Sequence, residues 1–164
     1  MSTQLLEPPV THDAGRAITS ITRSGRFSRK LRVEWPRAGS WITFDSTYEY
    51  DYWLLIRHRA AELGIAHIVR NTTKLPFTEP VEYTAGNGQT YLLNAYRPDF
   101  LLLYLDGRTE WVEIKGWQNA KHEATRAALL EHYPHLHVEL VTKGDLMAAQ
   151  REWANDIEGW VTVK

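Results

Sequence analysis

The sequence of 164 residues contains no cysteine. This absence excludes a disulfide scaffold, a thiolate zinc site, an iron–sulfur cluster and a cysteine nucleophile. The sequence also lacks a run of about 18 apolar residues and an apolar N-terminal segment, which predicts neither a membrane span nor a signal peptide. Together with the missing cysteines, this favours a cytoplasmic protein. Internal repeats and long linkers are absent too, so we expect one ordinary globular domain.

A net charge of −1 conceals a basic segment. Residues 16–37 hold seven Lys or Arg residues and a single acidic residue, Glu34, so this segment carries +6 and the rest of the chain −7. A basic arm beside an acidic body is typical of a polyanion-binding segment next to a carboxylate-rich site, and a solvated leader is the alternative. We expect a flexible leader and basic arm with short strands over residues 1–45, and a folded domain over residues 46–164. The candidate nucleic-acid contacts in the arm are Arg23, Arg26, Arg29, Lys30 and Arg32.

Apolar periodicity and turn residues predict the elements of the domain. Ser46 and Glu49 form a capping box at the start of a helix over residues 46–63, and Gly64 suits the left-handed residue that ends it. Strands are expected over residues 41–44, 65–70, 81–84, 90–95, 98–105, 109–115 and 137–142, and two more helices over residues 118–132 and about 145–156. This order predicts a mixed α/β domain in which helices flank a central sheet.

The most informative stretch lies between residues 97 and 116. Asp99 opens one expected strand, and Glu113 and Lys115 end the next, two residues apart and therefore on one face. Two carboxylates on one face make an all-oxygen site for Mg²⁺, which accepts one or two protein carboxylates and keeps water and phosphate as its other ligands. A structural carboxylate–Lys pair on a surface hairpin is the alternative.

Pro98-Asp99 followed by Glu113-Ile114-Lys115 resembles the motif of the PD-(D/E)XK nuclease superfamily. The resemblance implies a restriction-endonuclease-like fold and hydrolysis of DNA phosphodiesters with Mg²⁺, for which Mn²⁺ can substitute. It implies catalytic roles for Asp99, Glu113 and Lys115, with Asp99 and Glu113 as metal ligands. Superfamily members usually add an acidic residue from a preceding helix, and Glu49 matches that place as a further catalytic residue and metal ligand.

Glu49 also has a physical argument of its own. It begins a stripe that continues through Trp53, Ile56, Ala60 and Leu63, which is a single and otherwise apolar helix face. A carboxylate in line with the core can point past the helix end into a site. The alternative role is the capping box, and the two roles can coexist.

The resemblance narrows over residues 46–143. The order and spacing of Ser46-Thr-Tyr-Glu49, Tyr96-Arg-Pro-Asp99 and Val112-Glu-Ile-Lys-Gly116 are similar to those of the phage-encoded junction-resolving endonuclease I family. This similarity implies a homodimer that cuts branched DNA, including four-way junctions, in a bacterial or phage-infected cell.

Two other functions remain open. Ser28-Arg-Lys30 ahead of Phe44-Asp-Ser-Thr-Tyr-Glu49 is similar to the nuclease domain of TnsA-type transposon endonucleases, which implies nicking at transposon ends. A non-catalytic nucleic-acid-binding module on the same fold is the third reading. Intact Asp99, Glu113 and Lys115 argue against it, because clustered carboxylates repel phosphate.

Further candidate DNA contacts follow the motif. Trp117 comes directly after Lys115-Gly116 and is a candidate for a DNA surface as well as for the core. Lys121 and Arg126 lie on the next expected helix, where they could touch phosphate or simply be solvated. Three closely spaced histidines, at positions 132, 135 and 137, are more typical of solvated strand ends than of a metal site.

Strand parity gives a geometric expectation. Asp99 must share a sheet face with Glu113 and Lys115, which Asp99 opposite Lys115 would satisfy. The turn signal Asp106-Gly107 predicts a two-residue loop, which would turn Asp99 to the other face. The functional reading therefore predicts a three- or five-residue loop, or a bulge between Asp99 and Glu113.

Overall fold

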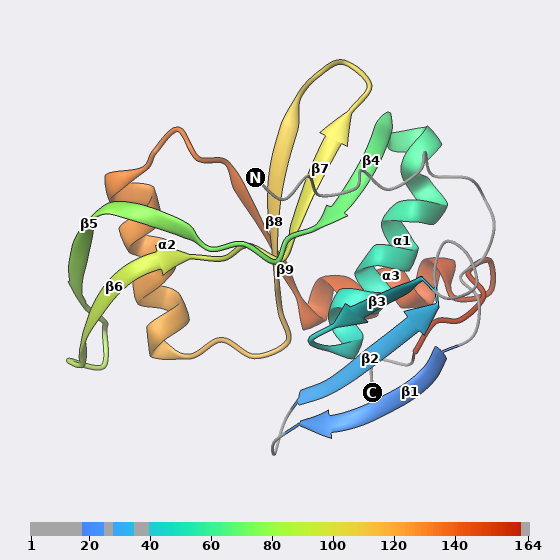
Figure 1. Cartoon of the computed structure of the whole chain (residues 1–164), viewed down its shortest axis with the longest axis horizontal. Helices are drawn as coiled ribbons and strands as arrows, with labels where there is room; N and C mark the ends of the chain where they lie inside the picture. Colours follow the sequence, from blue (N-terminus) through green and yellow to red (C-terminus); the bar gives the residue numbers. More distant parts are fainter. Residues whose placement is uncertain (1–17, 25–27, 35–39, 162–164) are drawn as a thin grey trace.

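The computed structural model describes residues 18–24, 28–34 and 40–161, which form nine strands and three helices (Figure 1). The chain forms a mixed α/β fold with a central sheet, as the sequence predicts. No helix within the described ranges is both long and apolar enough to cross a membrane.

Three antiparallel strands precede the first helix: β1 (Ile18–Ser24), β2 (Ser28–Glu34) and β3 (Trp41–Phe44). Leu31 and Val33 of β2 and Phe44 of β3 are fully buried, and they belong to the same core as α1. The expected division at residue 45 therefore does not separate two cores. The basic arm is in part a structural sheet, although Arg26 lies outside the described residues.

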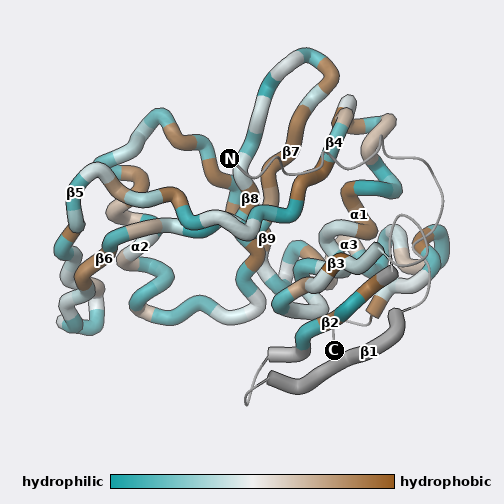
Figure 2. The backbone as a smooth tube through the Cα atoms, viewed as in Figure 1, coloured by the Kyte–Doolittle hydropathy of each residue, from teal (hydrophilic) through white to brown (hydrophobic). Residues whose placement is uncertain are grey.

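The central sheet has the strand order β4-β7-β8-β9. Antiparallel pairs join β4 (Ile65–Arg70), β7 (Phe100–Tyr104) and β8 (Thr109–Lys115), while β9 (Val138–Thr142) lies parallel to β8. The parallel pair needs a crossover, which α2 (Ala120–His132) provides. Apolar residues lie along β4, β7 and α1, which contribute to the main core (Figure 2).

Helix α1 (Thr47–Leu63) covers one face of the sheet beside α3 (Lys143–Trp153). Ser46 begins α1, since its Oγ accepts the N–H of Glu49 at 3.2 Å, and Gly64 ends it at φ 69°. Both ends agree with the sequence prediction. Helix α3 begins two residues earlier than predicted, because Thr142 and Asp145 form a capping box.

Asp51 is a fully buried carboxyl group in the middle of this core. Its Oδ1 accepts the backbone N–H of Val161 at 2.8 Å, which fastens the end of the described chain to α1. Burial raises the pKa of Asp51 to about 8, and the hydrogen bond from Val161 opposes this rise.

A lobe stands apart from the main core. The hairpin of β5 (Leu75–Thr84) and β6 (Thr90–Tyr96) packs on α2 through Val81, Leu93 and Ala128 (Figure 1, left). Strand β5 begins six residues before the expected strand 81–84, because its first residues pair with the end of β6. A bulge separates this pairing from the pairing of residues 81–84.

The β7–β8 hairpin decides the orientation of Asp99. Phe100 pairs with Val112, and Tyr104 N donates to Arg108 O at 2.9 Å, so the loop contains three residues, 105–107. Gly107 takes the left-handed conformation at φ 86°, which closes a three-residue loop. The two-residue turn suggested by Asp106-Gly107 is wrong, and the odd loop length required by the functional reading is confirmed.

Candidate active site

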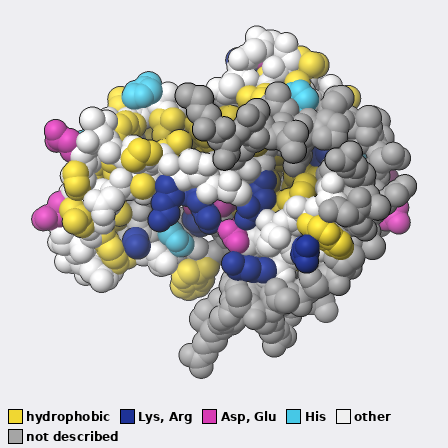
Figure 3. All heavy atoms as spheres, viewed as in Figure 1, with side chains coloured by type: hydrophobic (Ala, Val, Ile, Leu, Met, Phe, Trp, Pro, Cys, Tyr) yellow, Lys and Arg dark blue, Asp and Glu magenta, His cyan; other side chains and the backbone are white. Residues whose placement is uncertain are grey.

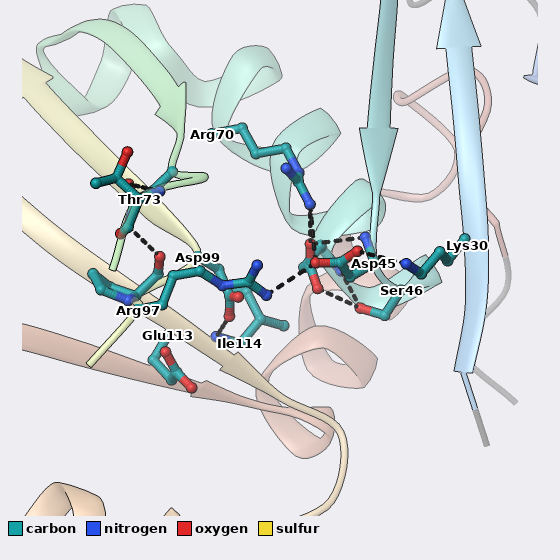
Figure 4. A network of polar contacts seen from close by, with 12 residues as sticks. Lys30, Asp45, Ser46, Arg70, Thr73, Arg97, Asp99, Glu113 and Ile114 are labelled. Carbon is teal, nitrogen blue, oxygen red and sulfur yellow. Dashed lines mark hydrogen bonds and ion pairs between the residues drawn. The ribbon is translucent and has the colours of Figure 1, made fainter. Parts of the chain in front are cut away.

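Asp99 lies where the β7–β8 pairing ends. Its backbone N–H donates to Val112 O at 2.9 Å, and its Oδ2 accepts the N–H of Ile114 at 2.7 Å (Figure 4). The Asp99 side chain thus accepts the hydrogen bond that a neighbouring strand would otherwise accept from Ile114. This hydrogen bond fixes the Asp99 carboxylate beside Glu113. The register differs from the expected pairing of Asp99 with Lys115, because Phe100 pairs with Val112.

Asn71 holds the backbone of this segment in place. The N–H of Asn71 donates to Asp99 O at 2.8 Å, and its buried side-chain amide donates to Pro98 O at 2.8 Å and to Thr73 O at 2.9 Å. Sequence reasoning missed Asn71. Its position directly after a predicted strand was the available signal.

The electrostatics of Asp99 reflect its neighbours. Burial is the first cause that raises its pKa, and the carboxylates of Glu113 and Glu49 raise it further. The Ile114 N–H and Lys115 lower it, and the balance lies at about 7, well above the ordinary 3.8. A positive charge placed next to Asp99 would favour its charged form.

Glu113 is buried and has two side-chain partners. Its Oε2 accepts the hydroxyl hydrogen of Tyr96 at 3.0 Å, and its Oε1 forms an ion pair with Lys115 Nζ. Glu113 and Lys115 project from the same face of β8, as strand alternation predicts. Burial and then the charge of Glu113 raise the pKa of Tyr96, so Tyr96 remains a hydrogen-bond donor.

The carboxylate of Glu49 is hydrogen-bonded to residues at the start of α1. Its Oε2 accepts the N–H of Asp45 at 3.1 Å and its Oε1 accepts the hydroxyl hydrogen of Ser46 at 3.2 Å. Burial raises its pKa, and Arg70, with its Nη2 3.8 Å from Oε2, opposes the rise. Among the described residues no three His, Asp or Glu side chains are arranged to hold a metal ion. The structure thus brings Asp99 and Glu113 together and places Glu49 in the cap beside them.

Asp45 gathers three cations that sequence reasoning did not connect. Its carboxylate lies 3.6 Å from Lys30 Nζ, 3.1 Å from Arg70 Nη2 and 3.0 Å from Arg97 Nη2 (Figure 4). The cations come from β2, from β4 and from the link between β6 and β7, so the cluster joins the N-terminal sheet to the central sheet. Lys30 is one of the predicted arm residues, and the structure places it in this cluster.

A cavity of about 760 Å³ opens beside Glu113 and Lys115, between β6, α2 and β9. Lys121 and Arg126, both predicted DNA contacts, line it together with Lys74 and Arg97. Figure 3 shows Lys and Arg side chains gathered around acidic ones in the hollow beside the lobe. His122 also lines it, and burial and then Lys115 lower the pKa of that histidine.

The remaining predicted contacts lie further out. Trp117 is 79% exposed, so it is a surface residue and not a core residue. The preceding Gly116 is needed for packing, since an added Cβ would overlap the ring of Tyr48. Arg32 is exposed on β2, with its guanidinium 4.4 Å from the centre of the Trp41 ring.

The other basic residues of the arm lie outside the described side chains, and the three histidines lie among the described residues. Arg23 and Arg29 pair across β1 and β2, and their side chains, like Arg26, lie outside the described part of the chain. His137 contacts Glu110 at 3.3 Å near the other end of β8.

A comparison with known families identifies the family to which the chain belongs. The family described as "Protein of unknown function (DUF1064)" matches residues 38–148, and the chain belongs to this family. Neither the search of curated proteins nor the search of solved structures found a match. The matched region contains Asp99, Glu113, Lys115 and all residues that line the cavity, while β1 and β2 lie outside it.

Proposed function

We propose that this member of the DUF1064 family is a metal-dependent DNA endonuclease that prefers branched DNA. The observation that carries the proposal is the placement of Asp99 next to Glu113 and Lys115, which themselves line a cavity together with further cations. The motif alone is compatible with a surface ion pair. A half-buried carboxylate whose pKa is raised first by burial and then by a second carboxylate is more typical of a functional site.

The donor atoms fit a hard divalent cation. Asp99 and Glu113 offer carboxylate oxygens, and Mg²⁺ takes one or two protein carboxylates in addition to water and phosphate oxygens. Mn²⁺ accepts the same ligands. Such an ion, when bound, would lower the pKa of a water molecule and neutralise phosphate charge.

The chain's own residues have separable tasks in this proposal. The Ile114 N–H and Asn71 orient Asp99, and the Tyr96 hydroxyl orients Glu113. Lys115 supplies a positive charge for the attacking water or for the charge that develops on the phosphate. The cations around the cavity provide electrostatic attraction for the DNA backbone.

The test is cleavage of end-labelled DNA by the full chain. A four-way junction and a fully paired duplex of equal length are incubated with Mg²⁺, Mn²⁺, Ca²⁺ or EDTA. We expect cleavage with Mg²⁺ and Mn²⁺, faster on the junction, and binding without cleavage in Ca²⁺. Asp99→Asn and Glu113→Gln should abolish cleavage and keep or strengthen binding, because each removes a negative charge near phosphate. Glu82→Gln, at an exposed position of β5, is the matched control.

The other possible results of the cleavage assay would contradict the proposal or favour one of the alternative functions. Cleavage in excess EDTA would contradict the metal site. Binding of DNA without cleavage in any metal would favour the non-catalytic binding module. Equal cleavage of duplex and junction would contradict the preference for branched DNA. Nicking confined to one strand would favour the TnsA-like activity, which acts at transposon ends.

A further inference from the structure

The cavity beside Glu113 is lined by two chemically different sets of side chains. One set is charged and consists of five cations and two carboxylates: Lys74, Arg97, Lys115, Lys121, Arg126, Glu113 and Glu123. The other set is apolar and comes from α2, β9 and the link between them: Ala127, Leu129, Leu136, Val138 and Leu140. The ligand that fits both sets has an anionic part and an apolar part.

Cleavage of a phosphodiester does not account for the apolar side chains of the lining. A phosphate in front of Glu113 and Lys115 needs the cations, and the bases of an intact duplex remain stacked on one another. Leu136, Val138 and Leu140 are nevertheless only half-buried in the free protein. At about 760 Å³ the cavity also lies within the range of about 300–1,000 Å³ found for small-molecule sites.

We propose that this cavity receives an unpaired base of the DNA, with the phosphates of that nucleotide on Lys121 and Arg126. The inference rests on the proposed nuclease function and names what its site recognises. A nucleotide combines a flat ring that can be buried among apolar side chains with a phosphate that needs cations. Five cations against two carboxylates make a purely apolar occupant a poor match.

This recognition would explain a preference for branched DNA. Extracting a base from an intact duplex costs unpairing and unstacking energy, and the cost is least for a base that is already unpaired. Junctions, flaps and bulges offer such bases beside the phosphate to be cut. A paired duplex would bind through its backbone alone.

The experiment measures binding of the full-length protein in EDTA, so that no DNA is cut. The probes are duplexes with one extrahelical nucleotide, which carries a natural base, no base, or 2-aminopurine. We expect the probe with the base to bind about tenfold more tightly than the abasic probe, a difference of about 1.4 kcal/mol. The fluorescence of 2-aminopurine should change on binding, because the base leaves its DNA neighbours.

Two helix variants test the location. Ala127→Phe adds a ring to the apolar part of the lining and should reduce the ratio of the two affinities to about one. Ala148→Phe makes the same change at an exposed position of α3 and should retain the ratio. Lys121→Ala and Arg126→Ala should each lower the slope of log affinity against log salt by up to about 0.9 and leave the ratio in place.

Equal affinity of the wild-type protein for the base and abasic probes would overturn the inference, whatever the variants do. An unchanged ratio in Ala127→Phe would overturn the location. Metal-dependent cleavage that shows no effect of an unpaired base would contradict only this inference. A protein that binds none of the probes would contradict the proposed function as well.

Discussion

Replacing Asp99 by asparagine should stabilise the protein, although it should destroy the activity. In the folded chain Asp99 is held near Glu113 and Glu49 and is partly removed from water, so its charged form is disfavoured. The asparagine side chain would keep an oxygen that accepts the Ile114 N–H and would carry no charge. The stabilisation therefore measures how much the fold loses by keeping a carboxylate at this position.

The magnitude follows from the pKa of Asp99, which rises from an ordinary 3.8 to about 7. Each pKa unit corresponds to about 1.4 kcal/mol, so the rise corresponds to about 4 kcal/mol at most, and we expect about 2–4 kcal/mol because Asp99 retains some contact with water. The sign of this contribution to stability follows from the direction of the pKa shift. A raised pKa favours the protonated folded state, so this group supports folding at low pH and loses that contribution as pH rises from about 4 to about 7.

The assay is urea unfolding in EDTA from about pH 4 to about pH 8, followed by the fluorescence of the seven tryptophans. The difference in unfolding free energy between Asp99→Asn and wild type should be small at the acid end and should grow to its full value above about pH 7. Asp51, with a pKa of about 8, titrates in both proteins and cancels in the difference. Glu131→Gln, at an exposed position of α2, is the control and should show no such growth.

Two results would refute the reasoning. If Asp99→Asn were less stable than wild type at about pH 8, Asp99 would be a structural ion-pair partner and not a carboxylate held against repulsion. If it were more stable by the same amount at every pH, the gain would come from packing. Mg²⁺ should stabilise wild type at about pH 8 and leave Asp99→Asn unaffected.

Three further changes test the surroundings of the site. Asp45→Asn frees the positive charge of Lys30, Arg70 and Arg97 for DNA, so affinity should rise a few-fold and its salt dependence should steepen; weaker binding would show that Asp45 is needed to arrange these cations. Glu49→Gln should reduce thermal stability modestly through the helix cap and lower cleavage less than Asp99→Asn does, and complete loss of cleavage with normal stability would place Glu49 in the metal site. Because one chain offers one site and symmetric cuts need two, we expect a homodimer by light scattering, and a monomer that cuts both strands of a junction simultaneously would contradict this.

Local rules predicted the parts of the fold that depend on neighbouring residues. The strands Ile65–Arg70 and Thr109–Lys115 have the bounds that alternation suggested, and α1 ends at the glycine that its sequence indicated. Glu113 and Lys115 share a face because strand parity leaves no other arrangement. These features need only the period of a strand and the chemistry of a helix end.

Features that depend on distant residues could not be predicted in this way. Asp106-Gly107 is a turn signal for two loop lengths, and only the pairing of Phe100 with Val112 selects three residues. Asn71 and Asp45 act on partners 27 and 52 residues away, and no local pattern connects them. The cavity likewise forms only when α2, the lobe and β9 come together.

The hydrogen bond between Asp51 and Val161 joins residues 110 positions apart. During synthesis α1 leaves the ribosome long before Val161 does, and until then the carboxyl group of Asp51 has only water or a proton to satisfy it. Because Asp51 lies in α1, this helix gains its buried hydrogen bond only when the end of the described chain has docked. Closing so long a loop is slow compared with forming a hairpin. Asp99, Glu113 and Lys115 are therefore synthesised before α1 gains its hydrogen bond to Val161.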